Sequence, residues 1–337
     1  MPSILHVARA RHLYDDVGHF RKQHDHGIPR LGGVAIFISF IITTLLFSLI
    51  DKALPLSYLL ISCIILFTMG LKDDLSGVNS STKFLIQFIV AAILVLLGDV
   101  RVTSMYGIFN IFNLPYIPSA ILSILLIMLI VNAFNLIDGI DSLAATTGII
   151  VNSTFALLFI YIKQYELAAI CLAIVGATVG FLRYNITPAK IFMGDTGALL
   201  IGLISAVMAI KYIEISKYAS TSTFTAPALT VAILIGPVFD TLRVFTIRIL
   251  SRKSPFEADR NHMHHRLLKL GFDHLQATLC LSALNLVAIG IVLVFSDLSN
   301  TLLITLILLI LIVFNWLVTF CIRSKERENL ALRNLFV

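Results

Sequence analysis

Ten long apolar runs divide this sequence, and they constrain its fold more than any other feature. A helix needs about 20 apolar residues to cross the hydrocarbon core of a membrane. Hydrophobic residues make up 58% of the 337 residues and charged residues only 13%, whereas soluble domains carry about a quarter charged residues. This composition argues against a soluble domain, a disordered chain and a nucleic-acid-binding protein. The sequence predicts an all-α, polytopic transmembrane helical bundle with spans near 31–50, 56–71, 81–98, 117–135, 142–162, 166–182, 196–212, 226–247, 276–295 and 301–322.

The loops between these spans alternate between two sides, and basic residues gather on one of them. Of the 25 Lys and Arg residues, 19 fall on one side, five on the other, and Arg243 lies inside a span. Basic loops mark the cytoplasmic side of a membrane protein. We therefore predict that both termini are cytoplasmic, together with the loops 72–83, 136–141, 183–195 and 248–275.

Three segments make up the expected domain organisation. Residues 1–30 form a cytoplasmic or interfacial N-terminal segment, 31–322 the transmembrane domain, and 323–337 a cytoplasmic tail. The first eleven residues, MPSILHVARAR, resemble the end of a helix. This pattern favours a first span that is absent from the chain over a helix that lies flat in the interface.

Acidic residues cluster at the ends of the predicted spans, where charge is costly and usually functional. They are Asp73 and Asp74 after the second span, Asp138 and Asp141 after the fourth, and Asp195 at the start of the seventh. Any one of them is readable as a helix cap, Asp195 above all. Capping does not account for all three segments, because Asn132, Asn135 and Asp138 step along one helical face. Since the loop parity places the segments on one side, we expect them to share a site.

A fourth segment on the same side, residues 258–271, is rich in histidine and arginine. His262, His265, Arg266 and Lys269 fall on one helical face, with His264 and Arg260 beside it. A zinc site and a basic interface belt are the alternatives, but the HExxH spacing is missing and a belt would use Lys and Arg. Histidines beside arginines suit an anionic group that must be held and protonated.

Together these segments indicate phosphoryl chemistry at a membrane surface. Clustered carboxylates repel one another unless a cation lies between them. Mg²⁺ meets this need, because it binds one or two carboxylates and fills its remaining positions with water and phosphate oxygens. Arginine and histidine would then neutralise the remaining phosphate charge.

Five motifs, in order along the chain, carry a family resemblance. They are IPRLGG (28–33), DDLSGV with TKFLIQ (73–87), NAFNLIDGIDSLA (132–144), FMGDTG (192–197) and SPFEADRNHMHHRL (254–267). In these motifs the chain resembles the polyprenyl-phosphate N-acetylhexosamine-1-phosphate transferases. The first and last motifs are similar to the N-acetylglucosamine branch rather than to the related phospho-MurNAc-pentapeptide translocases.

The resemblance implies an enzyme of the bacterial inner membrane that starts a cell-envelope polysaccharide, such as O-antigen or teichoic acid. The implied partners are a UDP-N-acetylhexosamine donor, undecaprenyl phosphate as acceptor and the lipid bilayer. The implied reaction yields UMP and depends on Mg²⁺, or on Mn²⁺ in its place. A homodimer is a further expectation, and nucleic acid is not an expected partner.

The resemblance also assigns roles to individual residues. Asp195 is the implied metal ligand, with Asn135 as a second ligand. Asp73 and Asp74 would lie near the lipid phosphate, one of them as a base. The implied substrate contacts are Asp138, Gly139 and Asp141 around the uridine and diphosphate, Phe192 on the uracil, and Arg260, His262, His264, His265 and Arg266 on the diphosphate and sugar.

Three further residues and one departure complete the expected site. Arg30 and Lys83 are either phosphate contacts or orientation charges, and Asn132 is grouped with the substrate-binding residues. The family usually has a glycine where this chain has Ser142, so the backbone after Asp141 is expected to differ slightly.

Three other classes of membrane protein match the sequence less well. An intramembrane prenyltransferase would need two Asp-rich motifs, and DDLSG lacks the third aspartate. A transporter would place charges in mid-span, where Asp240 and Arg243 are the main examples and are readable as an internal ion pair. An intramembrane aspartyl protease would need a GxGD motif, whose first glycine FMGD lacks.

Overall fold

The computed structural model describes residues 2, 4–6, 27–47, 55–217, 225–252 and 261–335. Within these ranges the chain is helical apart from short connections and one isolated β-bridge, Ser104 to Asn113. The elements, in chain order, are α2 (Gly32–Phe47), α3 (Leu56–Ser76), α4 (Ser80–Ala92), the π-helical turn η1 (Ile93–Leu97), the 3-10 turn η2 (Ile108–Asn110), α5 (Tyr116–Ile137), α6 (Leu143–Tyr161), α7 (Tyr165–Asn185), α8 (Gly194–Ser216), α9 (Ala226–Leu250), α10 (Met263–Leu270), α11 (His274–Val294) and α12 (Asn300–Leu335).

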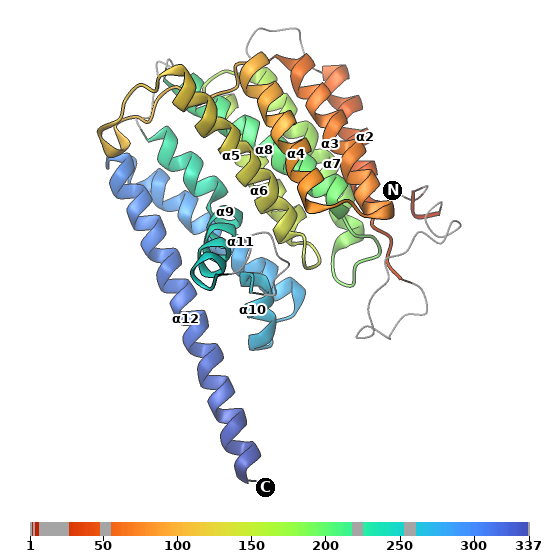
Figure 1. Ribbon diagram of the computed structural model, residues 1–337, viewed down its shortest axis with the longest axis vertical. Coiled ribbons are helices and arrows are strands. Elements are labelled where there is room, and N and C mark those ends of the chain that lie inside the picture. Colours follow the sequence, from red (N-terminus) through yellow and green to blue (C-terminus); the bar gives the residue numbers. More distant parts are fainter. Residues whose placement is uncertain are drawn as a thin grey trace.

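The predicted all-α polytopic bundle is confirmed, because each of the ten predicted spans corresponds to a helix. Nine helices in the described ranges are long and apolar enough to cross a membrane, counting α4 and η1 as one, and the shorter α2 is the tenth apolar helix. The helices lie side by side as a bundle (Figure 1). Which end faces the cytoplasm stays a prediction.

Two helices extend well beyond the predicted spans. Helix α3 continues to Ser76, so Asp73 and Asp74 lie in its last turn rather than in a loop. Helix α12 continues to Leu335, so residues 323–335 are its helical end, which extends below the bundle in Figure 1. The sequence there contains no Gly or Pro and is rich in residues that favour helices. Lys325 also donates a hydrogen bond of 2.9 Å to the carbonyl of Leu270, at the end of α10.

Helix α8 forms the centre of the bundle and is buried along most of its length. It contacts α2, α3, α5, α6 and α9. Its first turn lies against α2, where a Cβ on Gly33 would stand 2.2 Å from the Gly197 backbone nitrogen. Small residues of this kind allow helix backbones to approach closely within a membrane. The close contact fixes the start of α8 against the start of α2.

The backbone hydrogen bonding of helix α9 is interrupted at Pro237, and Asn285 of α11 compensates for the missing bond. Proline cannot donate the helical hydrogen bond to the carbonyl of Ile233. The Asn285 side-chain amide donates to that carbonyl at 3.1 Å and accepts a hydrogen bond from the Gly236 N–H, also at 3.1 Å. Asn285 therefore satisfies two backbone groups of α9 inside the bundle.

We expect Asn285→Ala to lower the free energy of unfolding by about 1–3 kcal/mol, because it removes the hydrogen-bond partner of a buried carbonyl and of a half-buried N–H. Denaturation of the purified protein in detergent would measure the loss. The matched control is Asn79→Ala, since Asn79 is exposed and its side chain caps no helix. Equal stability of the two variants would contradict this role of Asn285.

Candidate active site

Three aspartates from two helices meet at one end of the bundle. Asp73 and Asp74 come from the last turn of α3, and Asp195 comes from the first turn of α8. One oxygen from each carboxylate lies within 4.8 Å of the others. Lys83 of α4 donates hydrogen bonds to Asp73 Oδ2 at 2.6 Å and to Asp195 Oδ2 at 2.8 Å. Lys83 therefore provides a positive charge between two of the three carboxylates.

The side chain that caps the start of α8 is that of Asp74, not that of Asp195. Asp74 accepts hydrogen bonds from the backbone N–H groups of Asp195 at 2.8 Å and Thr196 at 3.1 Å, and from the Thr196 hydroxyl at 2.5 Å. Gly194 adopts a φ of +71°, and a Cβ there would lie 2.6 Å from both Asp74 carboxylate oxygens. The glycine of FMGD thus permits Asp74 to bind the start of α8, which positions Asp195.

A cavity of about 330 Å³ opens beside these aspartates. Asn135 hydrogen-bonds Asp195 through its side chain, and the Gly194 N–H hydrogen-bonds Asp138. Burial, followed by the nearby Asp195 and Asp74 carboxylates, raises the pKa of Asp138 well above its usual value. The cavity is lined by Arg30, Asp74, Asn135, Asp138, Gly139, Ile140, Asp141, Asn185, Phe192, Gly194 and Asp195.

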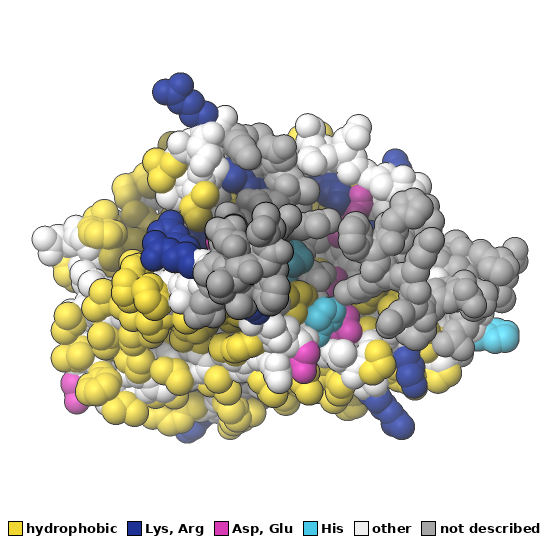
Figure 2. All heavy atoms as spheres, turned by 90° about the horizontal axis from the view of Figure 1, so that it is seen from below, with side chains coloured by type: hydrophobic (Ala, Val, Ile, Leu, Met, Phe, Trp, Pro, Cys, Tyr) yellow, Lys and Arg dark blue, Asp and Glu magenta, His cyan; other side chains and the backbone are white. Residues whose placement is uncertain are grey.

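This end of the molecule differs in composition from its flank. Figure 2 views the molecule from below and shows acidic, basic and histidine side chains on this face. Hydrophobic side chains cover much of the adjoining flank (Figure 2). The three acidic segments meet at this end, because Asp74, Asp138, Asp141 and Asp195 line the same cavity.

Backbone hydrogen bonds join the IPRLGG segment to the FMGD segment. The N–H groups of Gly32 and Gly33 donate to the carbonyls of Phe192 and Met193 at 3.0 and 2.9 Å, and the Phe192 N–H donates to the Pro29 carbonyl at 2.9 Å. This pairing explains why two motifs so distant in sequence line one cavity, because it places Arg30 and Phe192 at its edge.

Asp141 lines the cavity, but its carboxylate also has protein partners. Asp141 Oδ2 lies 3.3 Å from His274 Nδ1 and accepts a hydrogen bond of 3.3 Å from the Ala189 N–H. The next residue, Ser142, has a φ of +70°, which is the left-handed conformation that glycine adopts most easily. The Ser142 N–H donates to Asn185 Oδ1 at 2.8 Å, which holds this conformation in place.

We expect Ser142→Gly to leave the free energy of unfolding nearly unchanged, because glycine accepts the same backbone conformation. The transfer rate should stay within about twofold of the wild-type rate. Ser142→Val should lower the free energy of unfolding by about 1–2 kcal/mol, since a β-branched residue is disfavoured at positive φ. Denaturation in detergent would compare the two. A Ser142→Val protein as stable as Ser142→Gly would show that the turn relaxes to negative φ.

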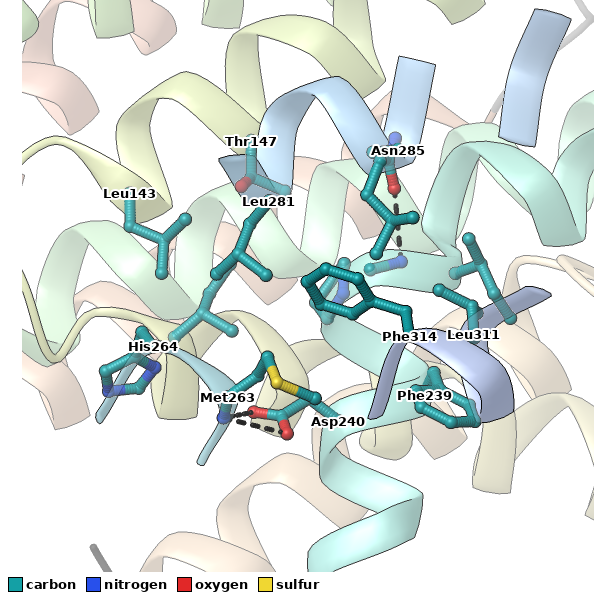
Figure 3. A pocket seen from close by; sticks show the side chains of 15 residues that line it. Leu143, Thr147, Phe239, Asp240, Met263, His264, Leu281, Asn285, Leu311 and Phe314 are labelled. Atoms are coloured by element: carbon teal, nitrogen blue, oxygen red, sulfur yellow. Dashed lines mark hydrogen bonds between the residues drawn. The ribbon is translucent and has the colours of Figure 1, made fainter. Parts of the chain in front are cut away.

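The histidine segment is held by Asp240 of α9. The Asp240 carboxylate lies 3.0 Å from His262 Nδ1 and accepts the Met263 N–H at 3.0 Å, the latter drawn in Figure 3. Arg243 donates to the same carboxylate at 2.7 Å, so the predicted ion pair is confirmed. Asp240 therefore also fixes the start of α10, a role that the sequence analysis missed.

His264 connects the histidine segment to the acidic end of α5. Its ring is buried, and a Cβ on Gly139 would lie 2.5 Å from its Nε2 atom. Within the described residues neither ring nitrogen has a hydrogen-bond partner. Burial, followed by the nearby His265, lowers the pKa of His264 to about 3, so the ring is neutral at physiological pH. It borders an apolar cavity of about 50 Å³, shown in Figure 3.

Some predicted site residues do not reach the acidic cavity. Arg266 donates hydrogen bonds to Asn315 and Thr319 of α12. Asn132 donates to Gln87 of α4 at 2.6 Å and to the Met128 carbonyl at 2.7 Å. Neither residue lines the cavity. Each of these side chains has a hydrogen-bond partner on a neighbouring helix, which sequence spacing does not reveal.

His265 and Arg260 are the remaining predicted site residues of the histidine segment. The His265 ring lies next to that of His264, with ring centroids 4.2 Å apart. Arg260 lies outside the described residues. The histidines form no metal-binding group in the part of the chain that the structure describes, where the acidic cluster is the candidate.

Asn185 is a cavity residue that the sequence analysis did not select. It lies at the end of α7, and its side-chain amide donates to the Ile191 carbonyl at 2.9 Å while its oxygen accepts the Ser142 N–H. Its position in the sequence could have indicated this, because Asn185 follows the predicted span 166–182 just as Asp73 and Asp138 follow the spans 56–71 and 117–135.

Comparison with known proteins supports the assignment to a family. Residues 56–213 match Glycosyl transferase family 4. A probable undecaprenyl-phosphate N-acetylglucosaminyl 1-phosphate transferase of Bacillus subtilis (strain 168) is 33% identical over 259 residues, which cover 77% of this chain and 71% of the relative. A decaprenyl-phosphate N-acetylglucosaminephosphotransferase of Mycobacterium tuberculosis (strain H37Rv) is 31% identical over 283 residues, covering 77% and 70%.

A relative of lower sequence identity is also a polyprenyl-phosphate transferase by name. An undecaprenyl-phosphate alpha-N-acetylglucosaminyl 1-phosphate transferase of Escherichia coli (strain K12) is 26% identical over 289 residues, which cover 83% of this chain and 77% of the relative. These names describe transferases and not prenyltransferases, transporters or proteases. The predictions of the family and of a glycosyl-1-phosphate transferase are thus confirmed: the chain belongs to glycosyl transferase family 4.

Proposed function

We propose that this enzyme transfers N-acetylglucosamine-1-phosphate from a UDP-sugar to undecaprenyl phosphate and releases UMP. The observation that carries the proposal is the single cavity that joins Asp195, Asp138, Arg30 and Phe192 at one end of the bundle. Such a cavity can receive a soluble nucleotide from the water and a lipid phosphate from the membrane. The names of the relatives support the same acceptor and sugar.

The acidic cluster fits a divalent cation, and we propose Mg²⁺, with Mn²⁺ as a substitute. Asp195 lines the cavity and has the Asn135 amide beside it, which gives the oxygen ligands that Mg²⁺ prefers. Asp74 is a weaker candidate ligand, because both of its oxygens already accept hydrogen bonds from the start of α8. A bound ion would neutralise charge on the diphosphate and favour attack at phosphorus.

The proposed reaction is a direct displacement. An oxygen of the lipid phosphate forms a bond to the β-phosphorus, the bond to the bridging oxygen breaks, and UMP leaves with the electron pair. A phosphate monoester is largely ionised at pH 7, with a second pKa near 6, so no strong base is needed. Asp73 is a poor covalent nucleophile, since Lys83 and the Val78 N–H donate to its oxygens at 2.6 and 2.7 Å. Lys83 also reduces the repulsion between the incoming phosphate and the aspartates.

The remaining cavity residues suit the donor. Phe192 offers a ring for the uracil, and stacking of this kind contributes about 1–3 kcal/mol. Arg30 is exposed at the cavity edge, where its guanidinium can bind a phosphate group. Gly139 and the neutral His264 ring behind it would frame the sugar, and Asp138 would donate or accept a hydrogen bond according to its protonation. We further propose that the cavity faces the cytoplasm of a bacterial inner membrane.

The test is a release assay on the purified protein in detergent. Undecaprenyl phosphate, UDP-N-acetylglucosamine and Mg²⁺ should together yield UMP, whereas omission of the acceptor or addition of EDTA should abolish it. Mn²⁺ added after EDTA would test the substitute ion. UMP formation with another UDP-hexosamine but not with UDP-N-acetylglucosamine would correct the sugar. UMP formation that resists EDTA would refute the metal requirement.

A further inference from the structure

A second polar cavity, of about 300 Å³, lies between α9, α10 and α12. None of its lining residues lines the acidic cavity. Four cationic side chains and a single carboxylate face it. The lining residues are Arg243, Ile247, Asn261, Arg266, Lys269, Asn315, Thr319, Ile322, Arg323 and Glu326.

Arg266 carries a positive charge in this cavity and makes no direct ion pair with a carboxylate of the described residues. It is only 7% exposed, and its guanidinium donates to the neutral side-chain oxygens of Asn315 and Thr319. Among the described residues it forms no ion pair, whereas Arg243 is paired with Asp240 at 2.7 Å. Burial, followed by the nearby Arg243, lowers the pKa of Arg266, and the Asp240 carboxylate, which is already paired with Arg243, offsets this only in part. A buried charge that is not directly paired is costly, and positive charges outnumber negative ones in this cavity, so the arrangement favours an anion.

The cavity lies where the apolar part of α12 ends. Ile322 closes the predicted span 301–322, and the charged sequence from Arg323 follows it directly. Just before this point, Trp316 and Phe320 are 62% and 60% exposed, with ring centroids 5.9 Å apart. Aromatic side chains of this kind mark the boundary between membrane and water. The cationic cavity therefore opens at the level of lipid headgroups, next to a surface that suits hydrocarbon chains.

We propose that this cavity binds the phosphate of an anionic membrane phospholipid. Arg266 and Lys269 of α10 and Arg323 of α12 would contact the phosphate, while the acyl chains lie along Trp316 and Phe320. Basic pockets between membrane helices are known to hold acidic headgroups. The lipid would join α10, which carries the histidines, to α12. This inference concerns a site separate from the acidic cavity and does not depend on the proposed transfer reaction.

The test compares lipids and variants on the full-length protein. After delipidation in an uncharged detergent, phosphatidylglycerol or phosphatidylcholine is added, and bound lipid is counted by native mass spectrometry while the Tm is recorded. Wild type should retain phosphatidylglycerol selectively and gain Tm from it. Arg323→Gln should weaken this binding about fivefold, as expected for one cationic contact near the surface. Arg266→Gln should abolish it.

The matched control is Arg327→Gln, because Arg327 is exposed on α12 one turn beyond Arg323 and does not line the cavity. It should bind phosphatidylglycerol as wild type does. Because Arg266→Gln could fail to fold, the comparison of Arg323→Gln with Arg327→Gln decides the question alone. Equal binding by these two variants would overturn the proposal. So would equal retention of phosphatidylcholine, an equal Tm gain from inorganic phosphate, or displacement of phosphatidylglycerol by substoichiometric undecaprenyl phosphate.

Discussion

Asp195→Asn should reduce the rate of UMP release by about 10³-fold, the scale on which loss of one group that stabilises developing charge lowers kcat. The substitution removes a negative charge from the position where a cation would bind, yet it keeps the size of the side chain and an oxygen that can accept the Lys83 hydrogen bond of 2.8 Å. The protein should therefore insert and fold normally. Initial rates at several Mg²⁺ concentrations, together with the Tm in detergent, would measure both effects.

Asp99→Asn is the matched control for this substitution. The Asp99 side chain is 73% exposed and pairs with Arg101, in the connection between η1 and η2 and away from the cavity. It should leave the rate and its Mg²⁺ dependence unchanged. Asp195→Asn with near-wild-type activity would remove Asp195 from the proposed metal site.

Asp74→Ala should impair both folding and activity. The substitution leaves the N–H groups of Asp195 and Thr196, and the Thr196 hydroxyl, without their acceptor. Because each unsatisfied buried group costs about 1–3 kcal/mol, we expect a loss of about 3 kcal/mol in the free energy of unfolding. Activity should also fall, since the start of α8 carries Asp195. Asp74→Asn, which retains one oxygen acceptor, should be intermediate in both respects.

The control for Asp74 is a second aspartate that caps a helix. Asp273 accepts the Gln276 N–H at 2.7 Å at the start of α11 and does not line the acidic cavity. Asp273→Ala should cost about 1 kcal/mol of stability and leave the transfer rate unchanged. If Asp74→Ala were no more harmful than Asp273→Ala, the hydrogen bonds of Asp74 would have no special role in positioning α8.

The helices of this protein could be predicted from hydropathy because apolar runs of the necessary length are rare outside membranes. The ends of the helices could not be predicted as well. Helix α3 continues through Asp73 and Asp74 because Asp74 finds partners on α8, a contact between residues 121 and 122 positions apart. Helix α12 continues past Ile322 because polarity ends a membrane span without ending a helix.

The site could be predicted to the level of segments but not of individual contacts. Loop parity placed the aspartates on one side, and in the structure Asp74, Asp138, Asp141 and Asp195 line one cavity. Helical periodicity grouped Asn132 with Asn135, yet Asn132 is bonded to Gln87. It also grouped Arg266 with His262, although the Arg266 guanidinium is directed to α12. Pairing of this kind depends on which helices become neighbours, and the spacing of residues along the sequence does not show that.

Two internal carboxylates, Asp74 and Asp240, each hold the beginning of a helix that contributes to the site, α8 and α10 respectively. Since mobile ions in solution screen such enclosed contacts much less than contacts at the surface, the framework of the site should keep its geometry from dilute buffer to concentrated salt. Arg30 is exposed at the cavity edge, so its attraction for an anionic donor is open to screening. Raising the ionic strength should therefore lower kcat/KM for the donor and leave kcat nearly constant.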